Sequence, residues 1–172
     1  MYNSTKHKVF LSFYHADDQK YKDKLETKFG SCMINKSVMD GEYDSDNSDE
    51  YIKRLIREDK ISDSSVVVVL VGRNTKYRKH VDWEIYAGLE KSIHGNSGLI
   101  GILLPTVPQI TSSNNSSLPE RLADNVRSNY AKLYTWDYAL SNFESIIQTA
   151  YSDRKLKADC INNTRLQKQK NG

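Results

Sequence analysis

The stretch Ser65-Val66-Val67-Val68-Val69-Leu70-Val71-Gly72 decides how this chain folds. Its length and its β-branched composition are typical of a strand that is buried on both faces of a parallel sheet. A polar turn at residues 73–79 follows, and then a helical pattern places Glu84 directly after Trp83 in what we expect to be the first turn. Ligands of open α/β sheets bind at this carboxyl edge of the strands. Glu84 is therefore the first candidate for a functional residue.

The helical pattern around Glu84 predicts where its side chain lies. At 100° per residue, one apolar stripe about 100° wide is formed by Val81, Ile85, Gly88, Leu89 and Ser92. Glu84 falls about 40° outside this stripe, so we expect a partly desolvated carboxylate at the core boundary. Position alone also fits a carboxylate that only complements the helix dipole. Trp83 points away from the stripe, so its indole should cover a loop, a second protomer or a ligand ring.

The rest of the chain alternates strand and helix patterns, which predicts a parallel sheet covered on both faces. Further strands are expected at residues 8–13, 33–39, 99–104 and 131–136. Helices are expected after Asp17 or Asp18, after Ser48, at 119–126 and from a capping box of Ser141 with Glu144. Five strands and about five helices suit a flavodoxin-like α/β sheet of order 2-1-3-4-5.

The bulk composition indicates a single cytoplasmic domain. The chain has 172 residues with 38% hydrophobic content, and no apolar run approaches the ~20 residues that span a bilayer. Its first residues lead into a strand without a signal-peptide core. We therefore expect no membrane partner. Cys32 and Cys160 are far apart and match no metal or redox spacing.

The basic charge of the chain is concentrated at its end. Residues 152–172 hold six Lys or Arg against two Asp, a net charge of +4, which leaves −1 for the rest of the +3 chain. We expect one folded domain at residues 1–152 and a basic polar tail at 153–172, as a helix extension or disordered. Because the charge belongs to a tail, we expect no nucleic-acid partner.

A second cluster of polar and aromatic residues follows the first strand: Phe13, Tyr14, His15, Asp17 and Asp18. These side chains should share a sheet edge with the end of the 66–71 strand, the expected neighbour. His15 could donate to a phosphate or transfer a proton, or it could be a surface or capping residue. Phe13, Tyr14 and Trp83 could stack on a base or simply pack in the core.

No metal or resident cofactor is expected. The acidic loop at residues 40–46 lacks the glycine at position six and the glutamate at position twelve of a calcium loop. The chain has no phosphate-loop motif, no nucleophile elbow and no histidine pair at metal spacing.

Taken together, these motifs resemble a known family. Residues 8–18 look like the opening strand of a Toll/interleukin-1 receptor (TIR) domain. Residues 66–72 with 83–85 resemble the strand and helix that carry the catalytic glutamate of TIR NAD⁺-cleaving enzymes. Residues 118–136, with Leu-Pro-Glu-Arg-Leu at their start, resemble the bacterial TIR-like family that includes the ThsB sensors of Thoeris antiphage defence. The resemblance covers about residues 7–152.

The resemblance implies a function. Members of the family detect phage infection and convert NAD⁺ into an ADP-ribose-derived signal that activates a separate effector. Carried over, Glu84 is the catalytic residue, and NAD⁺ is a substrate and not a cofactor. The implied substrate-binding residues are Phe13, Tyr14, His15, Asp18 and Trp83. The implied partners are NAD⁺, the effector, a phage-derived trigger and a second copy of the chain on activation.

Two other functions compete with this one. A TIR module can act without catalysis, as an adaptor that assembles through its faces. A nucleoside or nucleotide glycosyl-transfer enzyme on a related sheet would also place a glutamate near a ribose. Glu84 favours catalysis, because an adaptor needs no carboxylate at that position. Release of nicotinamide separates the first function from the other two.

Overall fold

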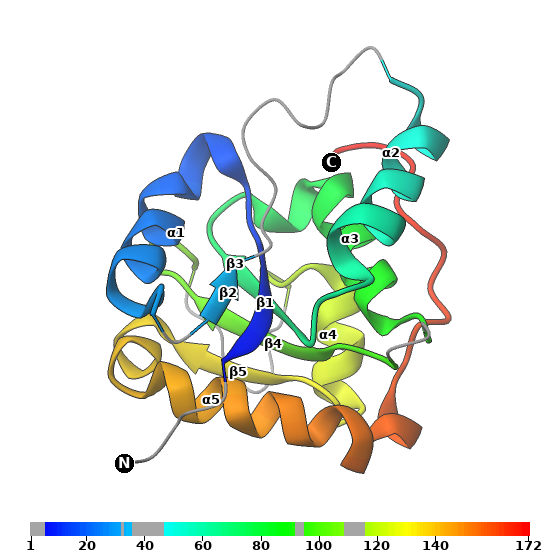
Figure 1. Ribbon diagram of the computed structural model, residues 1–172. Coiled ribbons are helices and arrows are strands. Elements are labelled where there is room, and N and C mark those ends of the chain that lie inside the picture. Colours follow the sequence, from blue (N-terminus) through cyan, green and yellow to red (C-terminus); the bar gives the residue numbers. More distant parts are fainter. Residues whose placement is uncertain (1–5, 32, 36–46, 92–94, 109–115) are drawn as a thin grey trace.

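The computed structural model describes residues 6–31, 33–35, 47–91, 95–108 and 116–172. Within these residues, five parallel strands form one sheet in the order β2-β1-β3-β4-β5 (Figure 1). The strands are β1 (His7–Ser12), β2 (Met33–Asn35), β3 (Val66–Val71), β4 (Gly98–Leu103) and β5 (Lys132–Thr135). The predicted flavodoxin-like α/β topology is therefore confirmed.

Helices cover both faces of this sheet. The α-helices are α1 (His15–Phe29), α2 (Asp49–Leu55), α3 (Lys79–Leu89), α4 (Glu120–Arg127) and α5 (Trp136–Leu156). Shorter helical turns are η1 (Ile56–Ile61), η2 (Thr75–Tyr77) and η3 (Ala158–Cys160). Figure 1 shows α1 and α5 on one side of the strands and α2, α3 and α4 on the other.

The alternation of side chains along β3 builds two cores. Val66, Val68 and Leu70 pack against α1 and α5 in one cluster, whereas Val67, Val69 and Val71 pack against α2, α3 and α4 in the other. All six residues are at most 1% exposed. Because both faces are buried, an uninterrupted apolar run is required, as the sequence indicated.

Three helix starts differ from the sequence predictions. Helix α1 begins at His15, so Asp17 and Asp18 lie in its first turn and do not cap it. Helix α3 begins at Lys79, which places Glu84 in the second turn instead of the first. Helix α5 begins at Trp136, where the Thr135 side chain accepts a hydrogen bond from Tyr138 N.

The predicted capping box of Ser141 with Glu144 does not begin the last helix, because α5 starts at Trp136. The helix is kinked at Asn142, whose backbone is non-helical, directly after Ser141. Asn142 Nδ2 donates to Tyr138 O (3.0 Å). Ser141 and Glu144 therefore lie inside α5, next to this kink. By contrast, the predicted cap at Ser48 is confirmed, since Ser48 Oγ accepts from Tyr51 N (3.2 Å).

The basic C-terminal residues are attached to the domain. Residues 161–172, which we call the C-terminal segment, run beside α3 and α4 (red in Figure 1). Its contacts include Arg165 with Asp124 (2.8 Å) and Gly172 N with Tyr77 O (3.0 Å). We had expected disorder or a helix extension here. The helix extends only to Leu156, and defined polar contacts hold the segment beyond it. No described helix is long and apolar enough to cross a membrane.

Candidate functional site

The ends of β1 and β3 bring the two predicted clusters together. These strands are neighbours, with Ser12 paired to Val69. Beyond them, Asn74 Nδ2 donates to Asp17 Oδ2 (2.8 Å), and Thr75 Oγ1 lies 3.5 Å from Asp18 Oδ2. The β1–α1 connection and the β3–α3 connection therefore lie side by side at the carboxyl edge of the sheet, as the sequence predicted.

Asp18 is a buried carboxyl group within this junction. Its side chain is 1% exposed, and a Cβ atom at Gly72 would lie only 2.4 Å from its Oδ2. Gly72 is therefore needed for the close approach of the two connections. Burial, reinforced by the negative charge of Asp17, raises the pKa of Asp18 to about 6. Asp18 lies within the junction and contacts Thr75, and its assignment to the substrate-binding residues stays a prediction.

The aromatic side chains after β1 lie in different environments. Phe13 is 4% exposed and stacks on the His15 ring, with centroids 4.2 Å apart. Tyr14 is half-buried, and the Arg78 guanidinium lies 4.2 Å from its ring centroid. His15 is half-buried. Of the three, Tyr14 and His15 are the more accessible to a ligand, and Phe13 mainly supports His15.

His80 links these residues to α3. Burial lowers its pKa, and the nearby charges of Lys79 and His15 lower it further, while Asp49 opposes them. The lowered pKa favours a neutral imidazole. The His80 ring also lies 5.2 Å from that of Trp83. His80 was not predicted from the sequence, although its position four residues before Glu84 places both side chains on one helix face.

Glu84 is buried in the structure. It is 4% exposed, in the second turn of α3 and on the helix face that it shares with His80. The sequence predicts a partly desolvated carboxylate at the core boundary, whereas the structure buries Glu84 almost completely. Burial strengthens the interaction of a carboxylate with any positive charge that develops beside it. The arrangement is suited to electrostatic stabilisation of a cation.

Trp83 does not present an open ring to solvent. It is 1% exposed, its Nε1 donates to Lys168 O (2.9 Å), and the ammonium groups of Lys53 and Lys79 lie 4.9 and 5.2 Å from its ring. The C-terminal segment is therefore what its indole contacts on the outer side of α3.

Asp82 and Arg121 form a buried network that the sequence analysis also missed. Arg121 Nε donates to Asp82 Oδ1 (2.8 Å), and its Nη1 donates to Asn163 Oδ1 (2.9 Å) and Arg165 O (2.8 Å). Asn125 exchanges two hydrogen bonds with the Asn162 backbone (2.7 and 2.9 Å). These groups attach the C-terminal segment to α3 and α4. An Asp and an Arg on separate helices give no sequence signal of pairing.

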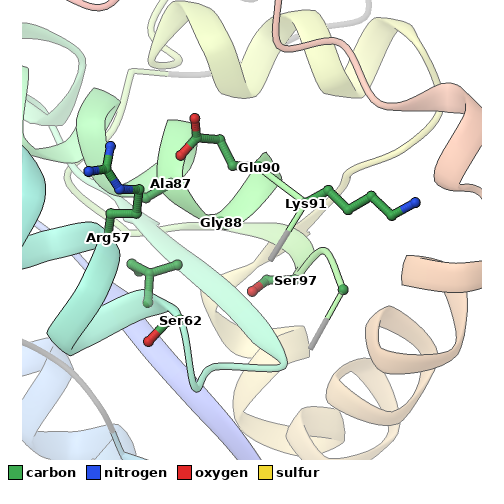
Figure 2. A pocket seen from close by; sticks show the side chains of 9 residues that line it. Arg57, Ser62, Ala87, Gly88, Glu90, Lys91 and Ser97 are labelled. Atoms are coloured by element: carbon green, nitrogen blue, oxygen red, sulfur yellow. The ribbon is translucent and has the colours of Figure 1, made fainter. Parts of the chain in front are cut away.

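Hollows of the described surface lie on several sides of α3. One of about 430 Å³ lies at the far end of α3 from His80 (Figure 2). Its hydroxyls are already engaged, because Ser97 Oγ donates to Ser64 O (2.9 Å) and Ser62 Oγ donates to Glu58 O (2.6 Å). Figure 2 shows Lys91 extending away from Arg57 and Glu90. This hollow contains no predicted site residue.

Another feature of the sequence lies outside the described residues. The acidic loop at 40–46, which follows β2, is not among them. Within the described residues, no group of three or more His, Cys, Asp or Glu side chains is placed to hold a metal ion. The candidate site therefore consists of Glu84 and His80 on α3 and of Tyr14 and His15 after β1.

Comparison with known proteins agrees with this geometry. A family model described as the TIR-like domain of the Thoeris protein ThsB matches residues 10–109. The match includes the end of β1, the β3–α3 connection and Glu84. No curated protein matches the chain. Because the family model spans more than half of the 172 residues, the chain belongs to the Thoeris ThsB TIR-like family and is a TIR-like antiphage-defence protein.

Proposed function

We propose that this protein cleaves NAD⁺ at the bond between nicotinamide and ribose and makes an ADP-ribose-derived messenger. The observation that carries the proposal is Glu84, a carboxylate that is 4% exposed on α3 beside the carboxyl edge of a parallel sheet. A buried charged side chain is costly for stability, and such groups concentrate at functional sites. The family match adds support, because it includes Glu84.

The chemistry asks for a carboxylate near the ribose. When the bond between C1′ and the nicotinamide nitrogen breaks, its electron pair leaves with nicotinamide, which departs as a neutral molecule. The ribose is left as an oxocarbenium-like cation. Glu84 would stabilise this positive charge and orient the ribose hydroxyls, as carboxylates do in glycoside hydrolysis. No general acid is required, because the leaving group needs no proton.

The nucleophile that attacks C1′ determines the product. Water gives ADP-ribose and releases a proton, an internal hydroxyl gives a cyclic isomer, and an added nucleophile gives a conjugate. Burial of Glu84 favours the latter two, because a site that excludes water suppresses hydrolysis. We therefore propose a cyclic or conjugated ADP-ribose as the messenger, which would activate a separate effector protein.

Residues near Glu84 would position the substrate. Tyr14 and His15 are half-buried at the end of β1, and His80 lies on the Glu84 face of α3. A neutral His80, favoured by its lowered pKa, could accept a hydrogen bond from a ribose hydroxyl. Phe13 and Trp83 are almost fully buried, so we assign them supporting roles.

Release of nicotinamide in infected cells tests this function. Cells with and without the protein would be infected and their lysates followed by mass spectrometry for NAD⁺, nicotinamide and ADP-ribose derivatives. The proposal predicts nicotinamide and an ADP-ribose derivative that depend on the protein. Infection-induced defence without either change would identify an adaptor module instead. The assay uses infected cells because we expect activation by a phage-derived trigger and self-association of the chain.

A further inference from the structure

A basic hollow of about 410 Å³ lies between the starts of α3 and α4 and the C-terminal segment. Four cationic side chains line it: Lys76, Arg78, Arg165 and Lys168. Two carboxylates, Asp82 and Glu120, also line it. Its volume falls within the range of sites that bind small molecules, ≈ 300–1,000 Å³. We call it the basic hollow.

Both carboxylates of the basic hollow are already paired. Asp82 accepts from Arg121 Nε (2.8 Å) and from Lys168 N (2.8 Å). Glu120 accepts from Arg165 Nη1 (3.2 Å), and the same guanidinium donates to Asp124. These carboxylates are therefore balanced by Arg121 and Arg165. They do not neutralise the other cations.

Two of the other cations, Lys76 and Arg78, have no anionic partner among the described residues. Lys76 Nζ donates to the Ser116 carbonyl (3.1 Å), and Lys168 Nζ donates to Gly172 O (2.7 Å). The Arg78 guanidinium lies on the Tyr14 ring, and its buried Nε has no hydrogen-bond partner in the described structure. Two positive charges without a carboxylate partner, beside the Lys168 ammonium, leave the hollow electropositive, which favours an anion. An arginine with an unused donor is suited to phosphate.

The basic hollow and the Glu84 carboxylate lie on different sides of α3, although Arg78, which lines the hollow, also contacts Tyr14 of the candidate site. Asp82, which lines the hollow, and Glu84 are two residues apart on α3, which places them about 200° apart around the helix axis. A ligand in the hollow would therefore lie on the opposite side of α3 from the Glu84 carboxylate. It would contact the C-terminal segment, which supplies Arg165 and Lys168.

We propose that the basic hollow binds the diphosphate group of a nucleotide at a site separate from Glu84. Lys76, Arg78 and Lys168 would contact the phosphate oxygens. Pro119 and Leu166, which also line the hollow, offer apolar surface to the sugar and base. The Lys168 carbonyl accepts a hydrogen bond from Trp83, the residue next to Glu84. A bound nucleotide would therefore stabilise the contact of the C-terminal segment with Trp83.

Calorimetric titration of the purified protein with ADP, inorganic pyrophosphate and adenosine tests this site. The variant Lys76→Gln/Lys168→Gln removes two charges and keeps the Lys168 backbone contacts. The matched control, Lys24→Gln/Lys155→Gln, removes two exposed charges elsewhere. We expect saturable ADP binding that is at least about tenfold tighter than adenosine binding, because charge-assisted hydrogen bonds exceed 1.4 kcal/mol. The hollow variant should lose at least about tenfold in ADP affinity, and the control should keep it.

Trypsin digestion supplies a second measurement. Bound ADP should slow cleavage after Arg165 and Lys168, and the Glu84→Gln variant should show the same protection, because the site does not use Glu84. Protection in that variant distinguishes this proposal from the proposed NAD⁺ cleavage. Failure of ADP to bind at millimolar concentration, or equal weakening in the control, would overturn the proposal. Pyrophosphate binding as tight as that of ADP would overturn the assignment to a nucleotide.

Discussion

Arg121 on α4 and Asp82 on α3 form a buried ion pair two residues before Glu84. The Arg121 side chain is fully buried, the Asp82 side chain is 9% exposed, and Nε and Oδ1 are 2.8 Å apart. The same guanidinium donates to the carbonyls of Arg165 and Leu166 in the C-terminal segment. One side chain thus joins α3, α4 and the C-terminal segment. We infer that this pair fixes the part of α3 that carries Glu84.

Replacing Arg121 with Met should strongly destabilise the fold. The change leaves the Asp82 carboxylate buried without its counter-charge, which typically costs 3–5 kcal/mol when one partner of a buried pair is removed. Urea unfolding followed by circular dichroism would measure the loss. The control is Arg127→Met, because the Arg127 side chain is 59% exposed and its pair with Asp124 should contribute at most about 1 kcal/mol. Equal losses in both variants would contradict the role given to Arg121.

Ending the chain after Cys160 should expose Trp83. The truncation removes Lys168 O, which accepts from the indole, and the Asn162 backbone that pairs with Asn125. In a Trp136→Phe background, Trp83 is the only tryptophan, so its emission should shift to longer wavelength. The free energy of unfolding should fall by at least about 2 kcal/mol, since each lost hydrogen bond contributes about 0.5–1.5 kcal/mol. An unchanged spectrum would show that the segment does not cover the indole.

Asp18→Asn should change how stability depends on pH. The folded state holds the Asp18 proton up to about pH 6, whereas an unfolded Asp releases it near 3.8. The folded state therefore binds more protons between these values, and wild-type stability falls as pH rises through this window. The variant should lack this fall, which amounts to at most about 3 kcal/mol.

Urea unfolding at several pH values between 3.5 and 7 would check the Asp18 prediction. Asp23→Asn is the control, because Asp23 lies exposed on the same helix. The difference between wild type and Asp18→Asn should grow from pH 4 to pH 6 and then remain constant. A difference that does not vary with pH would mean that Asp18 titrates normally in the folded protein.

The sequence predicted those parts of the fold that depend on local pattern. The run from Val66 to Val71 is uninterrupted and apolar, which predicts a strand that is buried on both faces. The run is too short for a long helix. The alternation of elements then determined the parallel sheet. The helix start at His15 was missed because its N-cap, Tyr14, is not a preferred capping residue, and Asp17 offered a stronger local signal nearby. The start at Trp136 was missed although Thr135 caps it, because residues 131–136 were predicted to form a strand and Ser141 offered a second capping signal.

The candidate site was predicted only where strand order determines proximity. The ends of β1 and β3 meet because the strands pair, so His15 and Asp18 could be placed beside the residues that precede α3. Contacts that depend on tertiary folding could not be predicted. Asp82 and Arg121 are 39 positions apart in the sequence, and Trp83 and Lys168 are 85 positions apart. No sequence periodicity connects the residues of either pair.

The central claim concerns the Glu84 carboxylate, and one comparison tests it most directly. Phage-infected cells carrying wild type, Glu84→Gln or the control Glu90→Gln would be lysed, and NAD⁺ and its products followed by mass spectrometry. Glu90 follows the same helix and is half-buried, so the control makes the same chemical change outside the candidate site. We expect an ADP-ribose derivative with wild type and Glu90→Gln and none with Glu84→Gln at equal protein levels. The same products in all three would contradict the account.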